Sequence, residues 1–309
     1  MTATSRVVIG IDAGATKTAA IAGLLDGGVL DRLRTGPSAI VGLPDDEALA
    51  VLRGVVDRLA PDRARIAHIV IGLSGVDFPD EHPEQHRRVA NALEVPRERL
   101  LLVNDGVVAL AGAAGRDRAT LVQHGTEVTT AWRERLGGET VFDSVGVADV
   151  FDVRLKAVPA VARMLDGRAT VTPLCARVLE HCGVTAAEFP RWMMRDPAAR
   201  ERILRLAPVV FEAWREGDAT ASRLVGRAVE DYVVTTLAMA ARLKPGPFQA
   251  CFGGGTIAQG GEALVAAIGE RLARERPDAV LATPAASPEE GALVLARHAA
   301  RDASARFGT

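Results

Sequence analysis

The chain has 309 residues, of which 48% are hydrophobic and 25% are charged, and its formal net charge is −2 at pH 7. This length exceeds the size at which one hydrophobic core usually stops growing, so two domains are expected. The composition excludes a disordered or fibrous protein, the charge gives no footprint for nucleic acid, and no apolar run is long enough to span a membrane.

The amino terminus and the cysteines predict a cytoplasmic protein. The first residues, MTATSR, precede only a strand's length of apolar residues, which is too short for a signal peptide. The three cysteines, Cys175, Cys182 and Cys251, are odd in number and match no metal spacing. Reduced, buried thiols are therefore expected.

The first half of the chain alternates strand-like and helix-like segments. The apolar patterns predict strands at Val7–Ile11, Ala19–Leu25, Val29–Arg34, Ile66–Leu73 and Leu100–Val103. They predict helices at Asp46–Leu59, Glu84–Leu93 and Val107–Ala114. A hairpin meander followed by β-α-β-α units is typical of an α/β fold.

The second half opens in the same way and then becomes mostly helical. The segments ATLVQHG, TEVTTAWRE and ETVFDS predict three strands with short polar turns, which indicates an internal duplication. Helices are then expected at Asp152–Leu165, Pro173–His181, around Trp192, at Ala198–Arg215 and at Ala219–Leu243. A strand FQACFGG, a helix beginning near Glu262, a strand AVLAT and a helix at Pro288–Arg301 complete the chain.

The turn DAGATKT follows the first predicted strand. It is not a Walker A loop, because Thr16 stands where the second glycine is required, and no G-x-G-x-x-G leads into a helix. Its backbone N–H groups and hydroxyls can face an anion, Gly14 allows close approach, and Asp12 can hold a metal through water. A plain β-turn with solvated Thr16 and Lys17 is the alternative.

A second polar motif, LLLVNDGVVAL, places Asn104 and Asp105 after a buried strand and just before a helix. The carboxyl end of a strand is the usual place for a site in an α/β fold. A carboxylate there can accept a proton from an alcohol that attacks phosphorus. Either residue can instead serve only as a helix N-cap.

A third motif, CFGGGTIAQGGE, ends a strand in Gly253, Gly254 and Gly255. Three glycines expose backbone to a flat ligand or allow a helix to pack closely. A plain loop is the alternative.

In this order the motifs resemble the sugar kinase, heat-shock chaperone and actin ATPase superfamily, and within it the BadF/BadG-type ATPase and N-acetylglucosamine kinase family. GIDAGATKT is similar to the family's first phosphate hairpin, VNDGVVAL to its catalytic-aspartate segment, GGGTIAQ to its adenosine loop and PEEGALVLA to its closing helix. The resemblance spans nearly the whole chain. It implies two ribonuclease H-like (actin-like ATPase) domains around a nucleotide cleft.

The resemblance also implies a site for ATP and Mg²⁺. The implied phosphate contacts are Gly14, Thr16, Lys17 and Thr18 in the first hairpin and Gly125 and Thr126 in the second. The implied adenosine contacts are Gly253, Gly254 and Gly255.

By the same resemblance, Asp12 lies near Mg²⁺, Asp105 is the catalytic base, and Asn104 and Asp105 contact the acceptor. The implied domains are residues 1–115 and residues 116–287, the second with a helical insertion. A C-terminal helix within residues 288–309 packs back on the first domain.

Three positions depart from the family's pattern. The second phosphate hairpin reads approximately G-T-G-S in the family, whereas here HGTEVTT places Glu127 at the second glycine. The segment ETVFDSVGVADVFDV keeps almost nothing of the family's sugar-contacting G-W-G…G-D-E-G-S residues. Ala39 stands nearest to the position of an asparagine that usually follows the third strand.

Several other polar residues have competing interpretations. His82 and His86 can share a helix face and bind a metal, but Pro83 suits a solvated helix start and no third ligand is evident. His124 is either a phosphate donor or part of a capped turn. Asp143, Asp149 and Asp152 either replace the lost substrate contacts or belong to a solvated loop.

The sequence therefore predicts an ATP- and Mg²⁺-dependent kinase that acts on a hydroxyl of a small sugar, amino sugar or cyclitol derivative, with an altered acceptor pocket. Two alternatives stay open: a degenerate member that binds nucleotide or sugar and signals through a partner, and an ATPase that drives a partner's conformational change. Dimers are common among relatives, so a homodimer is one option.

Overall fold

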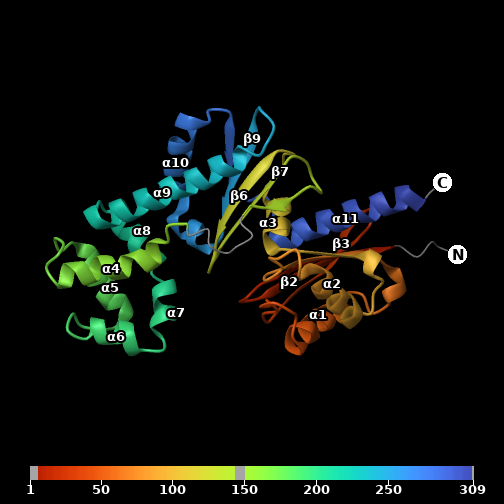
Figure 1. Cartoon of the computed structure of the whole chain (residues 1–309), viewed down its shortest axis with the longest axis horizontal. Helices are drawn as coiled ribbons and strands as arrows, with labels where there is room; N and C mark the ends of the chain where they lie inside the picture. Colours follow the sequence, from red (N-terminus) through yellow and green to blue (C-terminus); the bar gives the residue numbers. More distant parts are fainter. Residues whose placement is uncertain (1–5, 143–149, 308–309) are drawn as a thin grey trace.

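The computed structural model describes residues 6–142 and 150–307 and contains two mixed sheets (Figure 1). The amino-terminal part of the chain forms the first sheet. Its strand order is β3-β2-β1-β4-β5. The strands are β1 (Val7–Ala13), β2 (Thr18–Leu24), β3 (Gly27–Thr35), β4 (Ile66–Leu73) and β5 (Leu100–Val103). The first three strands form an antiparallel meander, and β4 and β5 extend the sheet in parallel with β1.

The second sheet repeats this arrangement, in the order β10-β9-β6-β7-β8. Its strands are β6 (Ala119–His124), β7 (Val128–Arg133), β8 (Thr140–Val141), β9 (Phe248–Gly253) and β10 (Ala279–Ala282). Strands β6, β7 and β8 again form an antiparallel meander, and β9 and β10 run parallel to β6. The equal strand order of the two sheets agrees with the duplication that the sequence indicates.

Helices cover the first sheet on both faces. They are α1 (Asp46–Leu59), α2 (His82–Leu93), α3 (Asp105–Ala113) and α11 (Pro288–Phe307). Helix α1 begins at the N-cap Asp45, which accepts a hydrogen bond from Ala48 N, and packs with α2 on one apolar core. Helices α3 and α11 pack on the other face, and α3 also contacts β6 and β7 of the second sheet. The junction between the sheets therefore runs through α3.

Glycines allow α11 to lie directly on β1 and α3. A Cβ at Gly10 of β1 would overlap the backbone of Leu293, and a Cβ at Gly291 of α11 would overlap the backbone of Val108 and Gly112. Tight van der Waals contact between backbones at this place holds α11 against β1 and α3.

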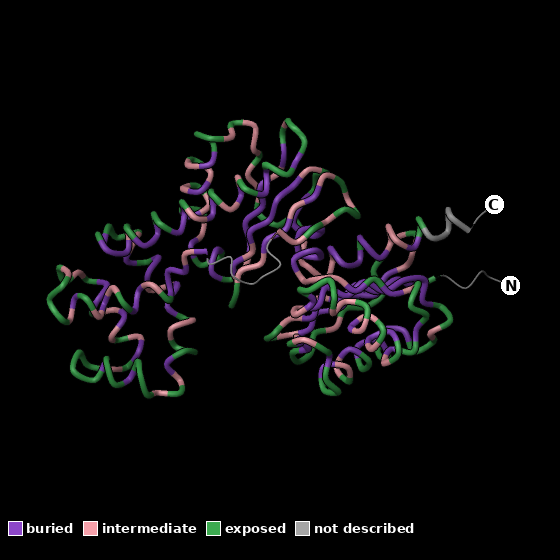
Figure 2. Tube along the Cα trace, in the orientation of Figure 1, coloured by how far each residue is buried: buried purple, intermediate pink, exposed green. Residues whose placement is uncertain are grey.

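The second sheet carries a helical arm, which lies at the left of Figure 1. The helices after β8 are α4 (Val153–Leu165), α5 (Pro173–Cys182), α6 (Phe189–Arg195), α7 (Ala199–Leu204), α8 (Ala207–Arg215), α9 (Ala219–Ala240) and α10 (Gly255–Glu275). They share one large core with the second sheet. In Figure 2, buried stretches recur along the central strands of this sheet and along the helices around it.

Two predicted helices differ from the structure. The single helix predicted at Ala198–Arg215 is wrong, because the segment forms α7 and α8, and Pro208 lies in the first turn of α8. Proline suits a helix start but removes a backbone donor from a helix interior. A helix does begin after Gly261, near Glu262 as predicted, but a short helical segment from Gly255 precedes it within α10, and Gly261, with φ 65°, forms the kink between the two.

None of the helices within residues 6–142 and 150–307 is long and apolar enough to cross a bilayer.

Candidate active site

A cleft of about 700 Å³ lies between the two sheets, at the ends of β1, β5 and β6. Its polar lining includes Asp12, Thr16, Lys17, Asp77, Asn104, Asp105, Gln123, Thr126, Glu127, Arg154 and Thr256. Most of these residues come from the motifs DAGATKT, VNDG, HGTE and GGGT, which are far apart in the sequence; Asp77, Gln123 and Arg154 lie outside the motifs. The fold therefore brings four of the predicted segments to one cavity.

The first hairpin joins β1 and β2 through residues 14–17, between the paired residues Ala13 and Thr18. Gly14 N donates to Lys17 O at 3.0 Å, which closes the turn. Gly14 O accepts from the backbone N of Ser38 and of Ala39 at 3.2 and 3.3 Å. The backbone N–H groups of Ser38 and Ala39 thus support the hairpin, and Ala39 is the residue nearest to the expected asparagine.

Gly14, Thr16 and Lys17 line the cleft, whereas Thr18 does not. The Thr18 side chain is fully buried, and its hydroxyl is hydrogen-bonded to Ser38 Oγ at 2.6 Å. The hydroxyl of Thr18 is therefore used inside the protein, and the geometry does not support it as a phosphate contact.

Asn104 and Asp105 have different roles at the end of β5. Asn104 is the N-cap of α3: its Oδ1 accepts from Gly106 N at 2.8 Å, and its Nδ2 donates to Asp77 Oδ1 at 2.8 Å. Asp105 occupies the first position of α3 and its carboxyl group lines the cleft. Burial raises the pKa of Asp105 to about 6; the Gly106 N–H opposes this shift, and the charges of Asp77 and Glu127 add to it.

Asp12, at the end of β1, shares a negative environment with Asp105. Burial raises the pKa of Asp12 to about 7, and the charges of Asp105 and Glu289 add to this shift, while Lys17 opposes it. Glu289 Oε2 is buried and has no hydrogen-bond partner within the described residues. Buried carboxyl groups that repel one another are stabilised by a cation.

These carboxyl groups fit a nucleotide-bound Mg²⁺ better than an all-protein metal cage. No group of three or more His, Cys, Asp or Glu side chains that could hold a metal is found in residues 6–142 and 150–307. Mg²⁺ commonly takes one or two carboxylates, with phosphate oxygens and waters completing its shell. Asp12, alone or with Glu289 beside it, supplies that number of ligands.

The second hairpin is one residue shorter than the first. Residues 125–127 join the paired residues His124 and Val128, and Gly125 N donates to Glu127 O at 2.9 Å. Glu127 is exposed and lines the cleft. Its φ is not positive, because Glu94 is the non-glycine residue with positive φ in the described chain. The glutamate is thus accommodated by a tighter turn without backbone strain.

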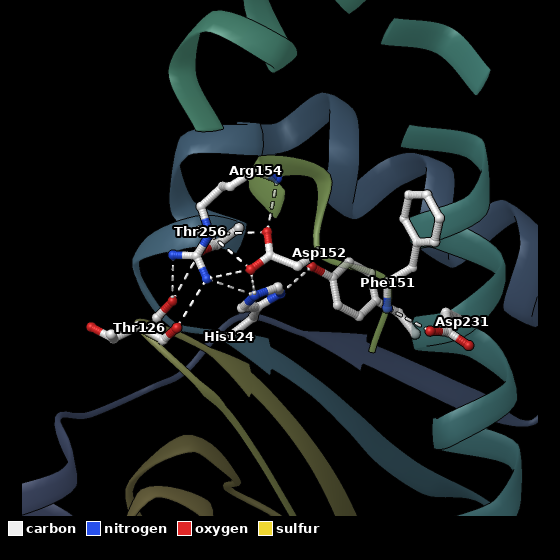
Figure 3. A network of polar contacts seen from close by, with 9 residues as sticks. His124, Thr126, Phe151, Asp152, Arg154, Asp231 and Thr256 are labelled. Carbon is white, nitrogen blue, oxygen red and sulfur yellow. Dashed lines mark hydrogen bonds and ion pairs between the residues drawn. The ribbon is translucent and has the colours of Figure 1, made fainter. Parts of the chain in front are cut away.

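Behind the second hairpin lies a buried polar network centred on Arg154 of α4 (Figure 3). Arg154 Nη1 donates to Gly125 O at 2.9 Å and Nη2 donates to Thr126 O at 3.0 Å. The guanidinium also contacts both carboxylate oxygens of Asp152. His124 Nε2 lies 3.1 Å from Arg154 Nη2, and its Nδ1 lies 2.7 Å from the hydroxyl of Tyr232.

This network answers two questions that the sequence left open. Asp152 is buried and paired with Arg154, so its interpretation as a solvated loop residue or a substrate contact is wrong; Asp143 and Asp149 lie outside the described residues. His124 is a buried support of the hairpin. The sequence gives only one indication that Arg154 belongs to the site: it is a basic residue two positions after the N-cap of α4, Asp152.

The glycine-rich motif packs against the second hairpin. Gly254, with φ 92°, fits beneath the backbone of His124, where a Cβ would overlap the carbonyl group. Thr256 Oγ1 donates to Gly125 O at 3.1 Å. Gly254 and Gly255 line the cleft, whereas Gly253 is buried against Pro284.

The remaining candidate residues have structural environments. His82 and His86 face β5, with Nε2 atoms 2.9 Å from Leu102 O and 3.0 Å from Leu100 O. They therefore stabilise the packing of α2 and are not simply solvated. The three cysteines are free and buried, as predicted.

The chain matches the model of the BadF/BadG/BcrA/BcrD ATPase family over residues 9–296. A curated relative is the N-acetylmuramic acid/N-acetylglucosamine kinase of Clostridium acetobutylicum, which is 25% identical over 244 residues, covering 76% of this chain and 79% of that protein.

Solved structures agree with this match. A provisionally named N-acetylglucosamine kinase from Chromobacterium violaceum has a TM-score of 0.65 and 25% identity, covering 94% of this chain and 99% of the other. A glucokinase of the ROK family from Streptomyces griseus, solved with glucose and AMPPNP, has a TM-score of 0.60 and 17% identity, covering 96% and 99%. The second likeness shows the two-domain, actin-like α/β fold that the sequence predicts.

Proposed function

The chain belongs to the BadF/BadG/BcrA/BcrD ATPase family, and from that premise we propose that it is an ATP- and Mg²⁺-dependent kinase. The acceptor is a hydroxyl of a small sugar, amino sugar or cyclitol derivative. The main support is one arrangement: the two hairpins and the half-buried Asp105 line a single cleft. Phosphate groups and a general base are thereby within reach of the same reacting atoms.

In the proposed reaction, the acceptor hydroxyl oxygen attacks the γ-phosphorus while Asp105 takes the hydroxyl proton. The new P–O bond forms as the bond to the leaving ADP breaks. Lys17 and the backbone N–H groups of the hairpins counter the negative charge on the phosphoryl oxygens. Mg²⁺, when bound beside Asp12, neutralises charge on the phosphates.

The acceptor pocket differs from that of the N-acetylglucosamine kinases. The sugar-contacting segment is replaced, and the polar groups beside Asp105 are the Asn104 amide and the Asp77 carboxylate. A site selects a substrate by hydrogen bonds that its analogues cannot complete. We therefore expect N-acetylglucosamine to be a poor acceptor for this chain.

A thermal-shift screen tests the proposed function. A ligand that binds only the folded state raises the melting temperature. We expect ATP with Mg²⁺ to raise it, and one member of a panel of sugars, amino sugars and cyclitols to raise it further. If a sugar raises the melting temperature and ATP does not, the result would instead favour the degenerate binding protein. The carboxylate of Glu127 in the second hairpin would contribute to that result, because it repels phosphate.

A further inference from the structure

We propose that Arg154 is a positioning residue, which fixes the peptide planes of the second hairpin so that the N–H groups of Thr126 and Glu127 point into the cleft. This inference deepens the proposed function and rests on it for the identity of the anion, a nucleotide phosphate. The orientation of the hairpin itself is a property of the protein without any ligand.

The two carbonyl groups that Arg154 holds determine the direction of the N–H groups that follow them. In a trans peptide the carbonyl and the following N–H point in opposite directions. Arg154 holds Gly125 O and Thr126 O, so the N–H groups of Thr126 and Glu127 point away from Arg154. Neither N–H group has a backbone or side-chain acceptor within the described residues. Two consecutive free N–H groups beside a cleft form a concave site for an anion.

The side chain of Arg154 is itself held in place. Its side chain is 5% exposed, and Asp152 accepts from Nε at 3.0 Å and from Nη2 at 2.7 Å. Asp152 is in turn fixed because it caps α4 by accepting from Arg154 N. A planar guanidinium held on one edge by a carboxylate presents its remaining N–H groups in fixed directions. Lysine cannot reproduce this, since its ammonium is a single point of contact.

The two hairpins differ in how they are supported, which gives Arg154 a role of its own. In the first hairpin, Gly14 O is held by two backbone N–H groups, from Ser38 and Ala39. In the second, the supporting groups are the side chains of Arg154 and Thr256. A single substitution can therefore release the second hairpin, whereas no side-chain change removes the backbone support of the first.

The test compares Arg154→Lys with the matched control Arg133→Lys. Arg133 is also buried, is paired with Glu139, and donates to carbonyl groups of Ala114, Arg116 and Asp117, but it does not line the cleft. Amide hydrogen exchange in the ligand-free proteins reports the hairpin, and calorimetry with ATP and Mg²⁺ reports the affinity. We expect Arg154→Lys to accelerate exchange at Gly125, whose N–H closes the hairpin by donating to Glu127 O, and to weaken ATP binding by about 10- to 100-fold. The control should change neither.

If Arg154→Lys does not fold, the double substitution Asp152→Asn with Arg154→Met replaces it. Asparagine retains the helix cap, and removing both charges of a buried pair is often neutral for stability. Unchanged exchange at Gly125 in a folded variant would overturn the inference, as would equal acceleration by the Arg133 control. Failure of the proposed function is a separate result: the wild type would then bind no ATP, whatever the exchange shows.

Discussion

At the residue scale, neighbouring polar residues at the end of β5 divide two tasks between them. Either Asn104 or Asp105 could be a helix cap from the sequence alone. In the structure Asn104 caps α3, and Asp105 lines the cleft. Burial raises the pKa of Asp105 to about 6, and the charges of Asp77 and Glu127 add to this shift. A base with such a pKa is ionised at neutral pH and still able to accept a proton.

The raised pKa of Asp105 predicts the acid limb of the pH profile. Because only the ionised carboxylate accepts a proton, kcat/KM, which reports the pKa of the free enzyme, should fall below about pH 6 and approach a tenfold loss per pH unit. An aspartate with an ordinary pKa would keep its activity about two units lower. Steady-state rates between about pH 5 and about pH 8 measure the limb, with the melting temperature recorded at each pH as a control for unfolding.

Asp77→Asn provides an independent check of this interpretation. The charge of Asp77 raises the pKa of Asp105, so its removal should move the acid limb to lower pH, whatever the substitution does to acceptor binding. An acid limb that stays in place in this variant, or that moves to higher pH, would contradict the assignment of the limb to Asp105.

Glu127 places a second carboxylate where ATP phosphates would bind. At about 5 Å and an effective dielectric near 20, the repulsion would be roughly 3 kcal/mol, but Glu127 is exposed, and solvent screening reduces this to about 1 kcal/mol. Glu127→Gly should therefore tighten ATP binding by about fivefold to tenfold, measured by calorimetry with Mg²⁺ present.

The charge-removing variant Glu127→Gln separates two possible causes. Because Glu127 does not have a positive φ, glycine relieves no backbone strain there, and both substitutions should tighten binding equally. Weaker binding in both variants would indicate that Glu127 coordinates the metal, and an effect confined to glycine would show that the backbone matters.

At the element scale, the sequence predicted most strands and the long helices, because apolar runs and their periods determine which segments can be buried. It failed where a helix ends for a local reason. The helix predicted at Ala198–Arg215 is interrupted before Pro208, which the helical pattern alone does not mark. The short helical segment from Gly255 to the kink at Gly261 was missed because its glycines are typical of a loop.

The contact of α11 with α3 predicts a strong effect of a small substitution. Gly291→Ala would place a methyl group into the backbone of Val108 and Gly112, so the helices must separate. We expect a loss of about 2 to 4 kcal/mol in the free energy of unfolding. In Gly54→Ala on α1, a Cβ meets no atom within 4 Å, and the substitution should stabilise the protein by about 0.5 to 1 kcal/mol. Urea unfolding of both variants checks the pair, and equal effects would contradict the packing argument.

At the scale of the whole molecule, the cleft is a product of two sheets with the same strand order. The sequence predicted the four motifs that line it, since each is a polar stretch at the end of an apolar strand. It could not predict the support of the second hairpin, because His124, Arg154 and Tyr232 meet only in the folded chain, across separations of up to 108 residues.

The central claim, phosphoryl transfer with Asp105 as the base, is tested most directly by mass spectrometry of an acceptor panel incubated with ATP and Mg²⁺. The wild type should yield one phosphorylated acceptor and an equal amount of ADP, and Asp105→Asn should lower this turnover by roughly 10²- to 10⁴-fold with almost unchanged affinity for ATP. Equal phosphorylation by the variant and the wild type would contradict the role of Asp105, and ADP formation without any phosphorylated acceptor would contradict the kinase assignment.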